Sequence, residues 1–276
     1  MGIPFIVLGA FILWRRACIP FALLSLISLY PILTFKKFAE PDNQNCERLE
    51  CVSTIAINLC QDTYALANFA KSDIFETDII FISELPYSVS KDQLGALFNL
   101  GETRQISYLI PQTQQIGSTL AIISKLPVSN IEFTLEKFPN TELLPRGILN
   151  FDVSFGTGHR LSIVAIHAPP PKTRAIMLAR DHYLTNANRH ISEKSDFILI
   201  GDFNMSPWEP GFKKLAGKCG GDPRWTRSWN ARKFWQHIAI DHALIGDGLS
   251  LNEFEVLSDI GSDHYPIRVT VYPNPQ

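Results

Sequence analysis

The chain contains few cysteines, and their spacing argues against a zinc site. Its 276 residues include five cysteines, and no two of them form the Cys-x-x-Cys pair that structural zinc sites commonly use. Cys46 and Cys51 lie close enough in sequence to pair in an oxidising compartment, but we expect both to be free structural thiols. Any metal ligands must therefore come from other residue types.

The chain also lacks an excess of charge of either sign. It carries 25 lysines and arginines against 27 aspartates and glutamates, which gives a formal net charge of −2. This balance produces no overall positive field of the type that attracts nucleic acids. No internal repeat or low-complexity stretch interrupts the sequence. The length is sufficient for one sizeable folded domain.

Long uncharged runs are confined to the N-terminal region. Residues 17–35 contain no charged residue and lie between Arg15-Arg16 and Lys36-Lys37. A run of 19 residues can cross a hydrocarbon core of roughly 30 Å, and flanking cations suit the headgroup zone. The small-residue cleavage site of a signal peptide does not follow it. We therefore predict a retained transmembrane segment at about 17–35.

These features divide the chain into three parts. We predict membrane segments in residues 1–39, a polar linker in 40–51 and a folded domain in 52–276. Residues 1–14 are also uncharged but are short for a second span. Cations flank the 17–35 run on both sides, so the positive-inside rule leaves the orientation open. We expect a bacterial inner-membrane protein whose folded domain is extracytoplasmic.

Beyond the linker, short apolar runs rich in β-branched residues are separated by turn residues. This pattern predicts many strands and few helices, an α+β domain of packed sheets with helices outside. Asp62 and either Ser88 or Ser90 are placed to cap two helices. The predicted helices cover residues 63–71, 91–100 and 172–191. The predicted strands cover residues 53–58, 78–84, 104–110, 118–124, 147–155, 160–167, 197–203, 238–245, 251–257 and 266–272.

Three polar clusters adjoin strand-like runs near the C-terminus. They are Gly201-Asp202-Phe203-Asn204, Ile240-Asp241-His242 and Ser262-Asp263-His264. Strand ends are rigid platforms that can aim side chains at a shared cleft. Carboxylates and a histidine in one place supply metal ligands, a general base and a residue that orients the base. The clusters therefore predict a hydrolytic enzyme.

Residue chemistry suggests how these side chains would divide the work. Glu84, which ends an early strand, and Asp263 are hard oxygen donors suited to Mg²⁺ or Mn²⁺. His264 has an ordinary pKa near neutrality and can act as a base, with Asp241 orienting its imidazole.

Alternation along a strand predicts which neighbouring side chains share a face. Asp202 and Asn204 are two residues apart, so they should project to the same side and face the attacking water. His242 follows Asp241 directly and should point away from the site. The remaining histidines, apart from His167 at the end of a strand, are expected at the surface: His159, His182, His190 and His237.

In their order along the chain, these motifs resemble the endonuclease/exonuclease/phosphatase superfamily, which includes DNase I-like nucleases, abasic-site nucleases, sphingomyelinases and inositol phosphatases. The resemblance covers about residues 52–272. Ser83 is a departure, because the family often has Gln before its metal-binding glutamate. The resemblance is carried by Ala56-Ile57-Asn58, Ile82-Ser83-Glu84, Gly117 with Ser124-Lys125-Leu126-Pro127, Val164-Ala165-Ile166-His167 and the three late clusters.

The resemblance implies a four-layered α/β sandwich of two mixed sheets flanked by helices, and it implies roles for eight residues. Asn58, Glu84 and Asp263 would serve the metal, Mg²⁺ or Mn²⁺. Asp202 and Asn204 would position the nucleophile and the transition state. Asp241 would pair with His264, and His167 would donate to the phosphate or the leaving group. A membrane region ahead of such a domain is similar to a bacterial subgroup that includes a glycopeptide-resistance membrane protein.

Tryptophans and cations gather in residues 205–236, between two of the motifs. The four that we expect to bind substrate are Trp225, Arg227, Trp229 and Arg232. Aromatic rings interleaved with cations could stack bases and hold phosphates, or they could rest at a lipid interface. Ordinary packing of tryptophan in a large loop is the third possibility.

These observations leave three functions open. We favour a membrane-anchored, metal-dependent hydrolase of a lipid-linked or other phosphoester at the membrane. A Mg²⁺-dependent DNA or RNA nuclease of the same fold is the second. A catalytically inactive, membrane-tethered binding module is the third, and the presence of every motif residue argues against it.

Overall fold

The computed structural model describes most of the chain after residue 37. The described residues are 38–42, 50–72, 77–98, 105–110, 116–139, 141–156, 158–222, 225–233 and 237–274. By its contacts the chain divides into two units, Met1–Lys36 and Lys37–Gln276. No helix in the described ranges is long and apolar enough to cross a membrane. The predicted span at 17–35 lies outside them.

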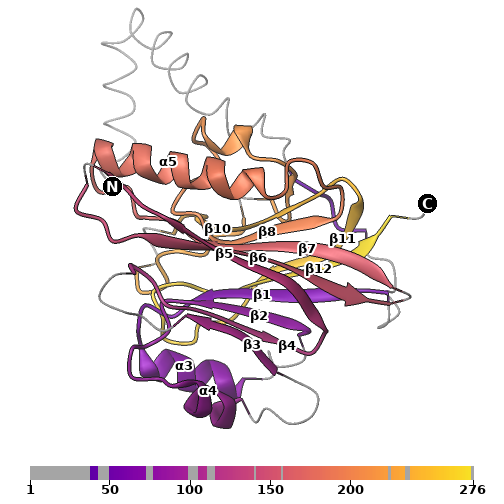
Figure 1. Ribbon diagram of the computed structural model, residues 1–276, viewed down its shortest axis with the longest axis horizontal. Helices are drawn as coiled ribbons and strands as arrows, with labels where there is room; N and C mark the ends of the chain where they lie inside the picture. The colour runs from indigo at the N-terminus through magenta and orange to yellow at the C-terminus, as the bar shows by residue number, and fades with distance from the viewer. Residues whose placement is uncertain are drawn as a thin grey trace, which may run out of the picture. The chain divides into compact units, whose positions relative to one another are not determined.

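Two six-stranded mixed sheets form the described domain (Figure 1). The only parallel neighbours among the described strands are β1 with β2 and β7 with β8. The first sheet has the order β11 (Leu249–Val256), β12 (Ile267–Pro273), β1 (Val52–Asn58), β2 (Ile79–Ser83), β4 (Leu120–Ser124), β3 (Gln105–Ile110). The second has the order β5 (Val128–Glu136), β6 (Arg146–Phe155), β7 (His159–His167), β8 (Phe197–Asp202), β10 (Asp241–Ile245), β9 (Lys218–Cys219). The predicted sandwich of two mixed sheets is confirmed.

Apolar side chains on both faces of the central strands explain why the sheets stack. Phe81 and Ile122 of the first sheet and Phe151 and Ile200 of the second belong to one buried cluster. The opposite face of the first sheet forms a second cluster with residues of helices α3 (Thr63–Lys71) and α4 (Lys91–Leu97). Helix α5 (Arg174–Arg189) lies on the side of the second sheet (Figure 1). Strands buried on both faces read as continuous apolar runs, and β2 and β8 are buried throughout.

The helices begin where side-chain caps are available. The Asp62 side chain accepts hydrogen bonds from two backbone N–H groups at the start of α3. Ser90, rather than Ser88, caps α4 and forms a capping box with Gln93. The predicted helix 172–191 begins later, at Arg174, because the Thr173 side chain caps it. A short 3₁₀ helix, η2 (Phe212–Lys214), lies in the loop-rich region.

Strand β5 was not predicted, for a physical reason. It is an edge strand whose residues are mostly exposed or half-buried. Its pairing with β6 shifts register between Ser129 and Glu132, where Asn130 has a φ of 50°. A bulge breaks the alternation of apolar and polar residues on which strand prediction depends.

Residues 38–42 lie against the domain at the end of the sheets where β10 finishes. Ala39 N donates to Cys219 O (2.8 Å), and Asp42 N donates to Leu251 O (2.8 Å). Asp241, the first residue of β10, lies at the other end, opposite Asp202.

Cys51 takes part in a disulfide, so the expectation of a free thiol is wrong for Cys51. Cys46 lies outside the described residues.

Candidate active site

Strand register brings the predicted polar residues to one end of the sandwich. Asp202 ends β8 and lies opposite both His167, at the end of β7, and Asp241, at the start of β10. Asn58, at the end of β1, lies beside Ser83, which precedes Glu84. A pocket of about 520 Å³ opens there. The predicted residues that line it are Asn58, Glu84, His167, Asp202, Asn204, Asp263, His264 and Trp229.

The backbone around this pocket is held in uncommon conformations. Three of the lining residues, Cys60, Glu84 and Asn204, have φ angles of 50°, 50° and 46°. Such left-handed conformations are uncommon for residues other than glycine and gather at functional sites. Gly201 has a φ of 133°, and a Cβ there would lie 2.1 Å from Ile166 O. Only glycine therefore allows β7 and β8 to approach so closely just before Asp202.

Asp202 is the centre of the site. Its Oδ2 accepts hydrogen bonds from Asn58 Nδ2 (3.1 Å) and Asn204 Nδ2 (3.1 Å). The Nε2 atoms of His167 and His264 lie 3.6 and 3.8 Å from the same oxygen. Burial and the charge of Asp241 raise the pKa of Asp202 to about 7. This carboxyl group can therefore gain or lose a proton near neutrality.

His264 is paired with a carboxylate. Its Nδ1 lies 2.8 Å from Asp241 Oδ2, so the predicted pairing of these two side chains is present. Burial acts to lower the pKa of His264, but Asp241, Asp202 and Asp263 together outweigh it and raise that pKa to about 10. Asp241 does not line the pocket. Its backbone N–H donates to Ser228 Oγ (3.0 Å), which helps to fix its position.

His167 has the opposite surroundings. Its Nδ1 accepts from Arg146 Nη1 (3.2 Å) and lies 2.7 Å from Ser118 Oγ. Burial, with the charges of Arg146 and His264, lowers the pKa of His167 well below its usual value. Because a guanidinium can only donate, the ring proton of neutral His167 must be on Nε2. That atom lies 3.3 Å from Glu84 Oε1.

Sequence reasoning missed Arg146 and Ser118. Arg146 begins β6 and is followed by an apolar strand, and nothing in its own neighbourhood distinguishes it from a surface cation. Its partner His167 is 21 residues away. Ser118 directly follows Gly117, the first residue of one of the motifs, which is only a weak sequence signal for a role in the site.

The structure brings together groups that could hold a divalent metal. Ligand atoms of Asp202, Asp241 and His264 lie within 4.8 Å of one another, although the hydrogen bond between His264 and Asp241 occupies one atom of each. Asp263 Oδ1 is buried and accepts no hydrogen bond from the described residues. Burial raises the pKa of Glu84, and Asp263 adds to that effect. An oxygen without a donor beside a second carboxylate fits a hard cation.

The four residues expected to bind substrate do not gather in one place. Trp229 lines the pocket, and its Nε1 donates to Asp263 Oδ2 (3.4 Å). Trp225 is 78% exposed and lies outside the pocket lining. Arg227 is exposed. Arg232 donates to Asp62 Oδ2 (3.3 Å) and Gly261 O (3.1 Å).

His242 points away from the pocket, as alternation predicts. It is buried against Phe203 and Phe212, and its Nε2 donates to Met205 O (2.9 Å). Burial lowers the pKa of His242 to about 4. His159 and His182 are exposed as expected, whereas His190 and His237 are half-buried.

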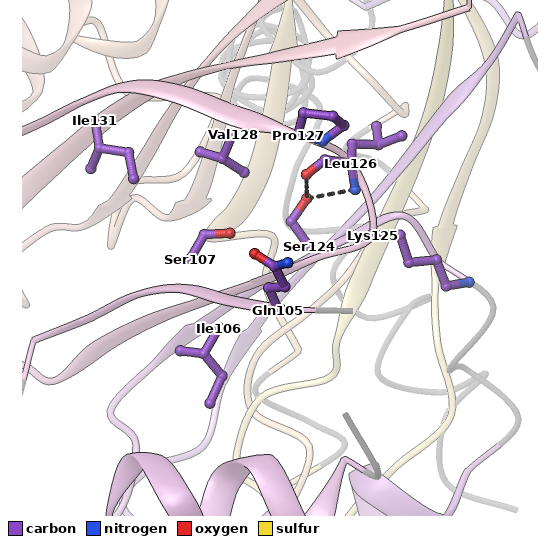
Figure 2. A pocket seen from close by; sticks show the side chains of 9 residues that line it. All are labelled: Gln105, Ile106, Ser107, Ser124, Lys125, Leu126, Pro127, Val128 and Ile131. Atoms are coloured by element: carbon purple, nitrogen blue, oxygen red, sulfur yellow. Dashed lines mark hydrogen bonds between the residues drawn. The ribbon is translucent and has the colours of Figure 1, made fainter. Parts of the chain in front are cut away.

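A second pocket, of about 530 Å³, lies where the chain passes from β4 to β5 (Figure 2). Its described lining residues include no aspartate, glutamate or histidine. The Ser124 hydroxyl bonds to the backbone of Leu126 (Figure 2). This pocket lacks the carboxylates and histidines that gather around Asp202, so the candidate active site is the pocket around Asp202.

Comparisons with known proteins agree with this geometry. The family model described as the Endonuclease/Exonuclease/phosphatase family matches residues 48–264. Humanized TDP2 from D. rerio has a similar fold, with a TM-score of 0.60 and 18% identity over 80% of this chain and 98% of that chain. SmcL gives a TM-score of 0.63 and 13% identity over 81% and 99% of the two chains.

An endonuclease/exonuclease/phosphatase from Beutenbergia cavernae gives a TM-score of 0.61 and 14% identity over 81% of this chain and 72% of that one. At these identities the solved structures support the fold alone. The search of curated proteins found no match.

Proposed function

We propose, from the premise that this chain belongs to the endonuclease/exonuclease/phosphatase family and is a phosphoesterase, that it hydrolyses a phosphoester whose alcohol portion is apolar. The observation that carries the proposal is the composition of the pocket around Asp202. Besides the polar groups, the pocket is lined by apolar side chains: Pro170, Pro171, Trp229, Ile238 and Ile240.

The metal would be Mg²⁺ or Mn²⁺, held by Glu84, Asp263 and Asn58. When bound, it would neutralise charge on the phosphoryl oxygens. The unpaired Oδ1 of Asp263 supports this choice over the cluster of Asp202, Asp241 and His264. In that cluster the shortest contact is already a hydrogen bond between two of the members.

The residues of the chain would divide the proton transfers between them. Asp202, with a pKa of about 7, accepts the proton of the attacking water, and Asn204 Nδ2 holds the Asp202 carboxylate in place. His264, kept protonated by the carboxylates around it, stabilises the negative charge that develops. The charged His264 can also supply the proton that the leaving alcohol needs, and neutral His167 donates a hydrogen bond from Nε2 to the phosphate or the leaving group. We thus transfer the role of base from His264, the residue expected from sequence, to Asp202.

The charge of the pocket favours a small or lipid-linked phosphoester over nucleic acid. Lys172 is the only lysine or arginine among its described lining residues. A groove for a nucleic-acid strand needs cations along successive phosphates and aromatic rings for successive bases. Trp225, Arg227 and Arg232 are not among the residues that line the pocket.

We further propose that the chain is anchored in a membrane through residues 17–35, with its domain extracytoplasmic. The uncharged run and its flanking cations support the anchor. The disulfide at Cys51 supports an oxidising compartment. Because residues 38–42 join the domain away from the pocket, the substrate should be offered both in vesicles and in solution.

The test is a substrate panel with Mg²⁺ on wild-type protein and on Ile238→Ala. Ile238 lines the pocket and is 44% exposed, so its loss removes apolar contact without removing a polar group. Turnover of a long-chain alkyl phosphoester should fall roughly tenfold in kcat/KM, while a glycerol phosphoester should change little. Trp225→Ala, outside the pocket, is the matched control. Preferred hydrolysis of DNA would support the nuclease instead, and binding without hydrolysis of any ester would support the inactive module.

A further inference from the structure

Arg180 is a fully buried cation beneath the candidate catalytic loop. It lies on α5, outside the pocket lining, and its side chain is 1% exposed. Arginine is almost never buried to this extent unless its charge is paired. Sequence reasoning gave it no role, because one arginine on a long helix resembles a solvated surface cation.

The guanidinium joins two parts of the loop that follows β8. Its Nη1 donates to Asn204 O (2.7 Å), and its Nη2 donates to Glu209 Oε2 (2.6 Å). A third acceptor, Asp181 Oδ1, lies 2.8 Å from Nη2. Glu209 also accepts from Ser206 N (2.9 Å). Arg180 therefore fixes both ends of the turn from Asn204 to Glu209.

Asn204 needs such support because its backbone is in the left-handed region, with a φ of 46°. Its Nδ2 donates to Ala168 O (2.9 Å) and to Asp202 Oδ2 (3.1 Å), and its N–H donates to Asp202 Oδ1 (2.8 Å). Movement of the Asn204 backbone would therefore move two of the donors that hold Asp202. Arg180 makes the one contact that holds this backbone from its carbonyl side among the described hydrogen bonds.

We propose that Arg180 is a positioning residue for the hydrolysis: it sets the Asn204 backbone, and through it the orientation of the Asp202 carboxylate. The inference rests on the proposed phosphoesterase activity. Arg180 does not touch the substrate, so its removal should lower kcat and leave KM nearly unchanged. A misplacement of about 1 Å in a catalytic group can cost on the order of a hundredfold in rate.

The experiment is a double-mutant cycle between Arg180→Met and Asn204→Ala, measured on the full chain with Mg²⁺. Arg180→Met should lower kcat roughly 10- to 100-fold, with KM changed by less than about threefold. In the Asn204→Ala background the same substitution should cost little more, because residues that act as a unit are not additive. Arg180→Lys keeps the charge but loses the forked donors, so its kcat should be intermediate.

Leu184→Ala is the matched control for stability. Leu184 lies one turn further along α5 and is 1% exposed, so its truncation destabilises the same helix. The kcat of the Leu184→Ala variant should stay near the wild-type value at temperatures below the Tm of that variant. Multiplicative losses in the cycle, or a loss in Leu184→Ala equal to that in Arg180→Met, would overturn the role of Arg180. If Arg180→Met does not fold, the cycle is run with Arg180→Lys under the same criterion. Absence of hydrolysis by the wild-type protein would instead overturn the phosphoesterase proposal itself.

Discussion

Two histidines flank Asp202, and their surroundings are opposite. His264 and His167 are both buried, at 5% and 2% exposure, and the Nε2 atom of each lies within 4 Å of Asp202 Oδ2. His264 faces the carboxylate of Asp241, whereas His167 faces the guanidinium of Arg146. We call these the carboxylate side and the arginine side of the pocket.

The comparison separates burial from charge as causes of a pKa shift. Burial disfavours the charged form of both imidazoles. On the arginine side a neighbouring cation adds to that effect, and the pKa of His167 falls. On the carboxylate side three anions reverse it, and the pKa of His264 rises to about 10. One pocket thus contains a charged and a neutral histidine at neutral pH, and each can donate a hydrogen bond from Nε2, but only the charged His264 can give up a proton.

The largest loss of turnover is expected from removing the proposed metal, because both sides of the pocket would act on a phosphoester held by that metal. Treatment with EDTA should abolish hydrolysis, and added Mg²⁺ or Mn²⁺ should restore it. The measurement is the initial rate before chelation, in chelator and after readdition. Full activity in EDTA would remove the metal from the account. The fold should survive chelation, which circular dichroism would check.

The next largest loss of kcat is expected from substituting His264 or Asp241 on the carboxylate side of the pocket. His264→Ala and Asp241→Asn should each lower kcat on the order of 10²- to 10⁴-fold. The double mutant should be little worse than either single mutant, because the two residues act as a pair. The measurement is kcat for the three variants on one substrate. Losses that multiply would show that Asp241 does not act through His264.

A smaller loss of kcat is expected from substituting Arg146 on the arginine side of the pocket. Arg146→Met removes a cation that lowers the pKa of His167, so that pKa should rise. More of His167 then becomes charged at acidic pH, and the acidic limb of the kcat profile should move to higher pH. We expect about a tenfold loss of kcat at neutral pH. Arg146→Lys retains the charge and serves as the control, so a limb that moves equally in both variants would contradict the charge argument.

The smallest effect on turnover is expected from substituting His242, a buried histidine that lies on neither the carboxylate side nor the arginine side of the pocket. Its folded pKa of about 4 lies below the ordinary 6.5, so the unfolded chain binds more protons between these values. His242 thus contributes stability that is complete above pH 6.5 and is lost as pH falls towards 4, about 3 kcal/mol in all.

Urea unfolding across that pH range measures this contribution. In His242→Asn the free energy of unfolding should fall less steeply as the pH decreases, while turnover at pH 7 changes little. An unchanged pH dependence of the unfolding free energy in this variant would assign the loss to other groups.

Site residues could be predicted from the sequence where they end an apolar run or belong to one of the motifs. Asn58, His167 and Asp202 could be placed because each ends a buried apolar run, and strand ends meet at one edge. Local caps such as Asp62 were equally accessible. Arg146 and Arg180 could not be found, because neither belongs to one of the motifs and each resembles a surface cation in its own stretch of sequence.

The role of the region around Trp225 and Trp229 was also hard to predict from the sequence. Composition located tryptophans and cations between two motifs, but it could not specify which way each side chain points. Trp229 faces the pocket, and Trp225 faces solvent. The charge state of a histidine is also beyond local sequence, because it depends on every charge that folding brings near.

The most direct test of the opposition between the two sides is an NMR pH titration of ¹⁵N-labelled histidines in the metal-free protein. His264→Ala and His167→Ala serve to assign the signals. We predict that His264 is still doubly protonated at about pH 8.5 and that His167 stays neutral, with its proton on Nε2, at pH values below the ordinary pKa of about 6.5. Titration of both histidines near the ordinary pKa of about 6.5 would contradict the account.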